Sequence, residues 1–331
     1  MKLSRYKSSW LLLSLLLAAL PAFAVTVPDL YEISVPVTSS RDAAFVDALK
    51  AIVVRVSGHR DAAARLGSAL NNPRQYIQRF GSTSDDMLQV GFDSVSIDRL
   101  LIESGLPIWG RERPATLVLL NIEAPDGSSY WIDATSNAAE REAISRVARQ
   151  RGLPLVWPDP GAQDRNETGG AADESAALLQ AAARYNANAT LLGRARSDGA
   201  GGWSVNWTLA SADGAAQARG SLDEGVNLAA DTFARVYAAS GSSLDSVAVE
   251  ISGIGNLNSY ASILNYLEGM TLVRGVALEQ VTGDTMRFRL AVRGDAGTLR
   301  RALALDGRLA PLAQSAEDAA AAGRLQFRYQ P

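Results

Sequence analysis

His59 is the only histidine of the chain, and it is the first residue to consider for acid–base chemistry because imidazole titrates near neutral pH. It directly follows an expected helix that ends at Gly58. A general base of this kind needs a nucleophile, and the chain contains no G-x-S-x-G elbow. We therefore predict that His59 is a surface residue at a helix C-terminus, where a cation suits the helix dipole. A general base remains the alternative.

The composition restricts the kinds of metal and cofactor sites that the chain can form. The chain has no cysteine and one histidine, which excludes zinc, copper and haem sites of the usual kinds. A carboxylate site for calcium or magnesium stays open, although no D-x-D-x-D-G loop occurs. Gly253 and Gly255 would begin a dinucleotide loop, but Asn258 replaces its third glycine, which indicates a tight turn. The glycines at 199–202 lack the Lys-Ser/Thr of a phosphate loop. We predict no metal and no cofactor.

Carboxylates could act in pairs, as they do in glycosidases. Five of them lie close together in sequence: Asp85, Asp86, Asp93, Asp98 and Glu103. A charged loop and solvated helix faces explain these residues equally well, so we predict no catalytic residue.

Arginines recur along one expected helix at positions 141, 146 and 149. They interleave with Glu140 and Glu142, which is typical of a solvated helix face.

The segment around Trp109 differs from these charged helix faces. It combines an aromatic residue with Arg111 and Arg113 between two expected domains. These residue types are favoured at interaction hot spots. We predict Trp109, Arg111 and Arg113 as a possible partner contact. The alternative is a linker whose Trp109 packs onto its own domains.

The first 24 residues have the pattern of a secretory signal peptide. Positive charge at Lys2, Arg5 and Lys7 precedes an apolar run at 10–20, and Ala22-Phe23-Ala24 supplies small residues at −3 and −1. We expect cleavage after Ala24 and a mature protein outside the cytoplasm. No later segment is apolar enough to span a membrane. Without cysteine, no lipoprotein-type lipid anchor is expected.

The charge of the mature chain argues against nucleic-acid binding. The leader carries three positive charges and no negative ones, so its removal takes the formal net charge from −3 to −6. A nucleic-acid binder would require a basic face.

Three α+β modules are expected after the leader at 1–24. In the N-terminal module, at 25–113, apolar residues alternate with other residues at 31–37, which predicts a strand. Apolar residues then recur at helical spacing at 45–56, which predicts an amphipathic helix. Asn71-Asn72-Pro73 predicts a further helix start, leading through Phe80. A second strand at 87–95 and a short helix capped by Ser96 follow.

The middle module, at 114–241, opens with the continuous apolar strand 116–122, which predicts burial on both faces. Helices at 137–150 and up to Tyr185 flank a short strand and a polar loop at 161–172. Three antiparallel strands at 189–196, 203–210 and 215–222 are expected next, joined by Asp-Gly turns. A helix at 228–239 closes the module.

The C-terminal module, at 242–331, follows a Ser-Gly-Ser-Ser linker and reads strand, helix, strand, strand, helix, strand. This is the ferredoxin-like βαββαβ plan. The alanine-rich stretch 313–323 is either a further helix or an insertion.

The order of landmarks resembles a known family. Leu30 to Val37, then Val54-Arg55-Val56-Ser57-Gly58, then Pro107-Ile108-Trp109 and Arg113-Pro114 are similar to the exported proteobacterial family filed as domain of unknown function 2066. The resemblance covers 25–239. It implies export and brings no established activity, so no catalytic residue is carried over.

The middle module is similar to a second family. Asn188 to Arg194, then Trp203 to Leu209 and a closing helix with Asp231, resemble the amino-terminal domain of the Tol translocation protein. That resemblance implies a Tol-N-terminal-like α+β fold and binding to other envelope proteins.

These observations favour a periplasmic, non-catalytic adaptor or assembly factor in the envelope of a Gram-negative bacterium, with envelope proteins as partners. Two alternatives remain. One is a carboxylate-dependent hydrolase of envelope polymers. The other is a periplasmic binding protein for a small solute, which would lie between the first two modules. Converging acids in a cleft would favour an enzyme, and an open sheet edge would favour an adaptor.

Export generates the first prediction. Mass spectrometry of the periplasmic fraction should find a mature chain that begins at Val25, because the leader satisfies the rules for signal peptidase. Recovery of the full-length chain in the cytoplasm would contradict this localisation.

Overall fold

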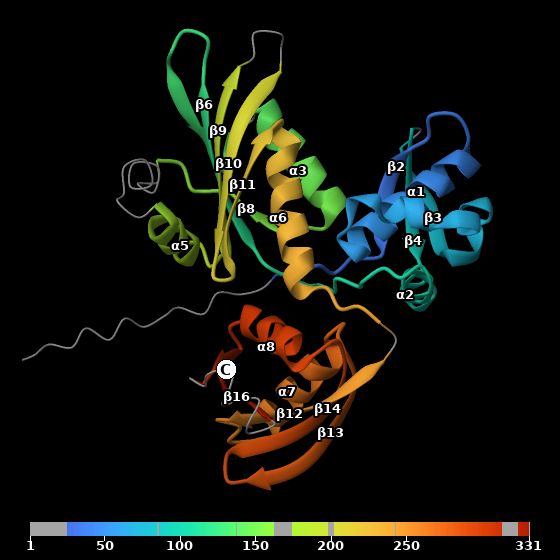
Figure 1. The fold of residues 1–331 in the computed structure, drawn as a ribbon, viewed down its shortest axis with the longest axis vertical. Helices are drawn as coiled ribbons and strands as arrows, with labels where there is room; N and C mark the ends of the chain where they lie inside the picture. The colour runs from blue at the N-terminus through green and yellow to red at the C-terminus, as the bar shows by residue number, and fades with distance from the viewer. Residues whose placement is uncertain are drawn as a thin grey trace, which may run out of the picture.

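The computed structural model describes residues 25–84, 86–136, 138–161, 174–197, 202–241, 243–312 and 324–330. Four expected features therefore lie wholly or mostly outside the described residues: the signal peptide at 1–24, the loop at 161–172, the turn at 198–201 and the stretch 313–323. The described residues form three α+β modules, each with its own sheet (Figure 1), which confirms the predicted fold class.

The N-terminal module packs helices against a three-stranded antiparallel sheet of order β2-β4-β3. Its long helix is α1 (Arg41–Ser57), which Ser40 caps and Gly58 ends in a left-handed conformation with φ 74°. Apolar residues on one face of α1, with Ile33, Val35 and Leu88 of the sheet, form the core. The other elements are β2 (Glu32–Pro36), η1 (Arg60–Arg65), η2 (Gly67–Asn71), η3 (Pro73–Tyr76), β3 (Ile77–Ser84), β4 (Met87–Phe92) and α2 (Ser94–Glu103).

Two local predictions in this module are wrong. Only one 3₁₀ turn, η3, follows Asn72, and the chain then enters β3 instead of a helix. Pairing of Ile77 with Phe92 and of Phe80 with Val90 outweighs the local helix signal. The cap of α2 is Asp93, whose carboxylate accepts the N–H of Ser96.

The middle module is a mixed sheet covered on both faces, with the order β11-β10-β9-β6-β7 and β8 beside β6. Leu117 and Leu119 of β6 face a core under α5, whereas Val118 and Leu120 face the core under α3 and α6. The prediction of a strand buried on both faces is thus confirmed. The elements are β6 (Thr116–Glu123), β7 (Ser129–Ile132), α3 (Ala139–Arg151), β8 (Leu155–Val156), α5 (Glu174–Arg184), β9 (Ala189–Ser197), β10 (Trp203–Ser211), β11 (Gly214–Gly220) and α6 (Leu222–Tyr237).

The C-terminal module has the expected order of helices and strands, with one strand added. Its sheet runs β13-β14-β12-β16-β15. The elements are β12 (Leu244–Ser252), α7 (Leu257–Gly269), β13 (Val273–Thr282), β14 (Thr285–Arg293), α8 (Ala296–Leu305), β15 (Leu309–Pro311) and β16 (Arg324–Tyr329).

The direction of the last strand departs from the ferredoxin-like plan. In that plan the last strand is antiparallel to the first, but β16 is parallel to β12. The added strand β15 explains the difference, because it takes the chain from α8 to the far end of the sheet and β16 returns antiparallel to it. The prediction is correct for the spatial order of β12, β13, β14 and β16 and wrong for this direction.

The ends of the N-terminal module meet in a small two-stranded sheet. Strand β1 (Val25–Thr26) pairs with β5 (Glu112–Arg113). The segment between α2 and β6 therefore runs through the junction of all three modules, where Ile108 also forms a bridge with Ala239 after α6.

The separate core of the C-terminal module leads to the second prediction. A fragment from Ser242 to Pro331 should fold alone and unfold cooperatively, since its apolar residues form their own cluster around Val249, Phe288 and Leu303. Thermal unfolding followed by circular dichroism measures this. A broad transition would show that the module depends on its neighbours.

Candidate functional site

A buried arginine, Arg113, joins the N-terminal and middle modules at the junction. Its side chain has no exposed surface, and its guanidinium carbon lies 3.9 Å from the ring centroid of Trp109. All its donors go to main-chain carbonyls at distances of 2.8 to 3.2 Å. The carbonyls belong to Arg55, Trp109, Gly110, Arg151 and Gly152.

Arg55 of α1 binds the same end of α3 from the other side. Its Nη2 donates to the carbonyl of Arg149, and its Nε donates to that of Gln150 at 3.2 Å. Its Nη1 donates to the carbonyls of Glu32 and Asp29. Arg55 and Arg113 together thus bond to the carbonyls at the end of α3, of which that of Arg149 also accepts the N–H of the cap Gly152.

A third arginine, Arg151 at the end of α3, bonds to the end of α1 and to α6. Its Nη2 donates to the carbonyl of Gly58 at 2.8 Å and to Asp231 at 2.6 Å, and its Nη1 donates to Asn227 at 2.7 Å. We call Arg55, Arg113 and Arg151 the arginine cluster. The C-terminal ends of α1 and α3 meet at this cluster, where the negative ends of both helix dipoles favour cations.

Burial costs the guanidinium groups part of their hydration. Burial lowers the pKa of Arg113 well below its usual range, with the neighbouring charges of Arg55 and Arg151 as further causes. Burial likewise lowers the pKa of Arg55 to about 10. The hydrogen bonds of Arg113 to carbonyls use all five N–H donors of a guanidinium group.

Two helix-terminal glycines allow this close approach. Gly152 ends α3 with φ 64°, and a Cβ there would come within 2.8 Å of Nη1 of Arg113. Gly58 ends α1, and a Cβ there would come within 2.3 Å of the Cβ of Ala234 in α6.

The burial of Trp109 and Arg113 corrects the prediction of a partner contact. Both side chains are fully buried at the junction, so neither can reach a partner at the surface, and the alternative of a linker that packs onto its own domains is correct. Arg111 is only half-buried, and its main-chain N–H donates to Oγ1 of Thr271 at 3.1 Å. The segment binds the modules of this chain to one another.

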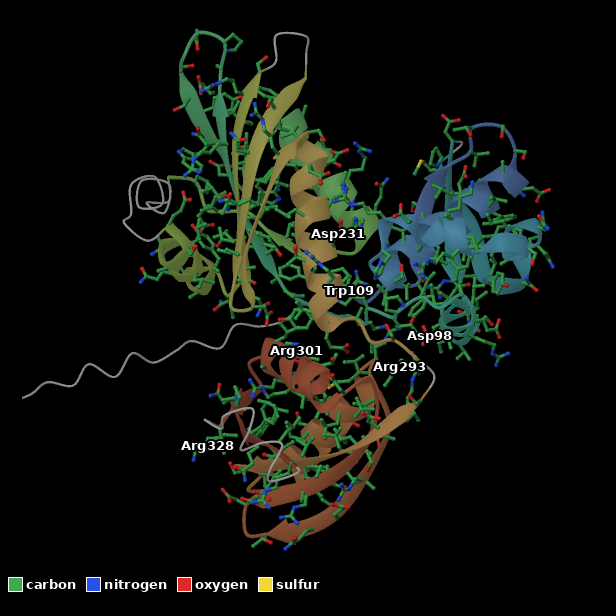
Figure 2. The ribbon with its side chains drawn as sticks, viewed as in Figure 1. Asp98, Trp109, Asp231, Arg293, Arg301 and Arg328 are labelled. Carbon is green, nitrogen blue, oxygen red and sulfur yellow. The ribbon has the colours of Figure 1, made fainter. Side chains whose placement is uncertain are left out.

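A second polar contact attaches the N-terminal module to the C-terminal one. Asp98 of α2 accepts hydrogen bonds from Tyr31 at 2.7 Å, Arg274 at 2.6 Å and Arg293 at 3.3 Å (Figure 2). Beside it, the N–H of Thr271 donates to the carboxylate of Glu112 at 3.2 Å, and burial raises the pKa of Glu112.

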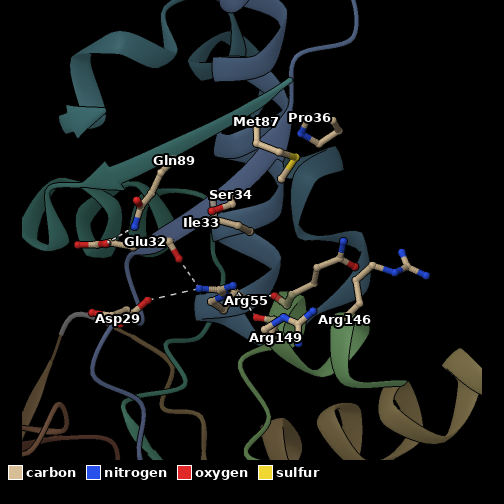
Figure 3. A pocket seen from close by; sticks show the side chains of 11 residues that line it. Asp29, Glu32, Ile33, Ser34, Pro36, Arg55, Met87, Gln89, Arg146 and Arg149 are labelled. Atoms are coloured by element: carbon tan, nitrogen blue, oxygen red, sulfur yellow. Dashed lines mark hydrogen bonds between the residues drawn. The ribbon is translucent and has the colours of Figure 1, made fainter. Parts of the chain in front are cut away.

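A groove of 540 Å³ opens beside Arg55 of the arginine cluster, between the N-terminal sheet and α3 (Figure 3). Arg55 lies at its base and contributes to both walls through its hydrogen bonds. One wall consists of β2 and β4, and the other is the last turn and a half of α3. The lining residues are Asp29, Glu32, Ile33, Ser34, Pro36, Arg55, Met87, Gln89, Arg146, Arg149 and Gln150.

Of the five charged residues that line the groove, Glu32 and Arg149 are in ion pairs. Glu32 is bound by Arg79 and by Nε2 of Gln89, and Arg149 pairs with Glu142 at 2.6 Å. Arg146 is exposed, and it makes no ion pair with any residue that the structure describes.

His59 lies beside a second cleft, of 410 Å³, between the end of α1 and α6. Its side chain is exposed, as predicted, and forms no hydrogen bond within the described part of the chain. The nearby carboxylate of Asp231 has both oxygens occupied, one by Arg151 and the other by Arg60 at 2.7 Å. Among the described residues, no hydrogen bond joins Asp231 to the imidazole of His59.

The carboxylates singled out in the sequence are not brought together in a cleft. Asp93 caps α2, and hydrogen bonds from Ser96 lower its pKa. Asp98 belongs to the contact between modules, and Glu103 is exposed at the end of α2. Asp85 lies outside the described residues. Within the described ranges, no three histidines or carboxylates lie close enough to hold a metal ion.

Comparisons with known proteins add one match. Residues 24–110 match the model of a family described as a domain of unknown function, DUF8605. The match covers most of the N-terminal module, and its number differs from that of the family that the sequence landmarks resemble. No curated protein and no solved structure matches the chain. No helix among the described residues has the length and apolar character to cross a bilayer.

The arginine cluster and the groove were missed by sequence reasoning. One signal was present: Arg55 falls between Ile52 and Val56 on the apolar stripe of α1, and Arg151 follows Val147 and Ala148 in the same way on α3. A cation on an apolar face must be buried with acceptors. Sequence alone does not say which acceptors these are.

The cluster generates the third prediction. Replacing Arg113 by Met should lower the free energy of unfolding of the mature protein by roughly 3 kcal/mol, because carbonyls at the end of α3 lose their donors while they stay buried. Arg113→Lys should recover only part of this, since one ammonium cannot span five carbonyls. Urea unfolding measures both.

Arg328 supplies the matched control, because it is exposed on β16, away from the junction (Figure 2). Arg328→Met should change stability by less than about 0.5 kcal/mol. Equal losses for Arg113→Met and Arg328→Met would show that the cluster is not what stabilises the junction.

Proposed function

We propose that the protein is an exported, non-catalytic binding protein that acts as an adaptor or assembly factor in the cell envelope. The observation that carries this proposal is the groove between β2 and α3. Its two walls belong to different modules, and Arg55 bonds to both of them. A surface built in this way has a fixed shape before any partner arrives, which reduces the entropy cost of binding.

The other elements of the proposal come from the sequence. The leader supports export to the periplasm of a Gram-negative bacterium. The resemblance to the exported family of domain of unknown function 2066 and the likeness of the middle module to the Tol amino-terminal domain support a role among envelope proteins. The negative charge of the mature chain supports partners other than nucleic acid.

Binding of a small solute in the same groove is the second candidate. The groove volume of 540 Å³ lies within the range of small-molecule sites, about 300 to 1,000 Å³. A hydrolase has weaker support, because Asp93 caps a helix and Asp98 and Asp231 bind arginines at the contacts between elements.

Photo-crosslinking in cells tests the proposal. Pro36 is exposed in the groove and can be replaced by a benzophenone amino acid, and Arg328, exposed on β16 of the C-terminal module, is the control position (Figure 2). We expect the probe at position 36 to form discrete adducts with envelope proteins that the probe at position 328 does not form. Identical adducts at both positions, or none at either, would overturn the adaptor role.

The fourth prediction separates binding from catalysis. The His59→Gln variant keeps a polar side chain but loses the group that titrates near neutral pH. The crosslinks from position 36 and the growth of cells that depend on the protein should both be unchanged. Loss of growth with intact folding and intact crosslinks would favour the hydrolase alternative.

A further inference from the structure

Strand β2 has one free edge. It pairs with β4 on one side, and it is the outer strand of the order β2-β4-β3. Free edges of this kind can accept a further strand from another chain.

The register shows which groups of β2 point outward. Phe92 donates to the carbonyl of Tyr31, and Val37 donates to that of Asp86, so odd-numbered residues of β2 bond to β4. In an antiparallel pair the alternate residues face the other way. The main-chain groups of Glu32, Ser34 and Pro36 therefore lie on the free edge.

This edge faces the groove. The outward carbonyl of Glu32 accepts a hydrogen bond from Arg55, which also bonds to the carbonyl of Arg149 in α3. Ser34 and Pro36 line the groove beyond that point. The N–H and C=O of Ser34 and the C=O of Pro36 are thus open to an occupant of the groove, and they form no hydrogen bond to the described residues.

The arginines of α3 on the opposite wall favour a negatively charged occupant of the groove. Arg146 and Arg149 lie three residues apart on α3 and line the groove. Glu142 pairs with Arg149, and Arg146 stays without an ion pair among the described residues. Two carboxylates line the groove: that of Glu32 is bound by Arg79 and Gln89, and that of Asp29 lies near Arg55 at the base. An extended segment with a carboxylate directed at α3 fits this arrangement, and one with a lysine there does not.

We propose that the groove binds an extended, acidic peptide segment of an envelope protein, which adds as a strand to β2. This inference rests on the proposed function and names the chemistry of its partner. Main-chain hydrogen bonds to Ser34 and Pro36 hold the segment, and its carboxylate pairs with Arg146 and Arg149. The added strand is short, because Pro36 has no N–H and the N–H and C=O of Glu32 are occupied within the protein.

Three synthetic nine-residue peptides of alternating Val and Thr test the proposal, with Glu, Gln or Lys at two matched positions. Fluorescence anisotropy with the mature protein should show that the Glu peptide binds about tenfold more tightly than the Lys peptide. The double variant Arg146→Glu, Arg149→Glu should reverse this order, whereas Arg328→Glu should not change it. Equal binding of all three peptides would overturn the acidic specificity.

Backbone methylation tests strand addition itself. N-methyl groups on alternate residues of the Glu peptide block the N–H groups of one edge. Two peptides are compared, one methylated at the odd-numbered positions and one at the even-numbered positions. One of them should bind at least about tenfold more weakly than the unmethylated peptide, and the other should bind with unchanged affinity. The Ser34→Ala variant should bind normally, because it keeps the main-chain groups. Equal effects of the two methylation patterns would show that the peptide does not bind as a strand.

The outcomes separate this inference from the proposed function. Adducts with envelope proteins from position 36, together with no peptide binding, would leave the adaptor role intact and overturn strand addition. Absence of both would overturn the two together.

Discussion

The C-terminal end of α3 is the constraint on which the other features depend. A helix ends with carbonyls that have no intrahelical partners, and the last residue of this helix, Arg151, and its cap Gly152 are buried, where water cannot readily supply donors. Arg55 and Arg113 supply them, one from α1 and one from the segment that leads into β6. A guanidinium has five N–H donors in a rigid plane, so one side chain can bond to carbonyls of several segments at once. The same bonds that complete α3 therefore set the position of the N-terminal module relative to the middle one.

The groove is a consequence of that arrangement. Its walls are β2 and α3, and Arg55 bonds to the carbonyl of Glu32 on one side and to that of Arg149 on the other. The free edge of β2 consequently faces a helix at a fixed separation instead of open solvent. An exposed strand edge is normally a liability for aggregation. Here Pro36, which has no N–H, and the hydrogen bond at Glu32 limit the edge to a short stretch, and α3 forms the opposite wall of the groove.

The sequence predicts the elements better than the junction, for physical reasons. Periodicity identifies α1, β6 and the strands around Val249 and Phe288, because each buries its own apolar face locally. It fails at β3, where pairing with β4 outweighs a helix signal, and at β16, whose direction depends on β15. It fails most clearly at Trp109 and Arg113, because an aromatic–arginine pair has the same composition at an exposed contact and in a buried junction. The acceptors of Arg113 are main-chain carbonyls, which no residue type reveals, and those of Arg55 on α3 lie 94 and 95 positions away.

The polar character of the junction also bears on what the protein can do. Apolar side chains pack with little directional preference, so modules joined by a hydrophobic interface can shift relative to one another. Hydrogen bonds from guanidinium groups to carbonyls are directional and hold only one arrangement. The contact of Asp98 with Arg274 and Arg293 fixes the N-terminal module from a second side, against the C-terminal sheet. A module held in two places by directional bonds presents β2 at a constant angle to α3. That constancy is what strand addition requires, because a peptide must meet Ser34, Pro36 and Arg146 at the same time.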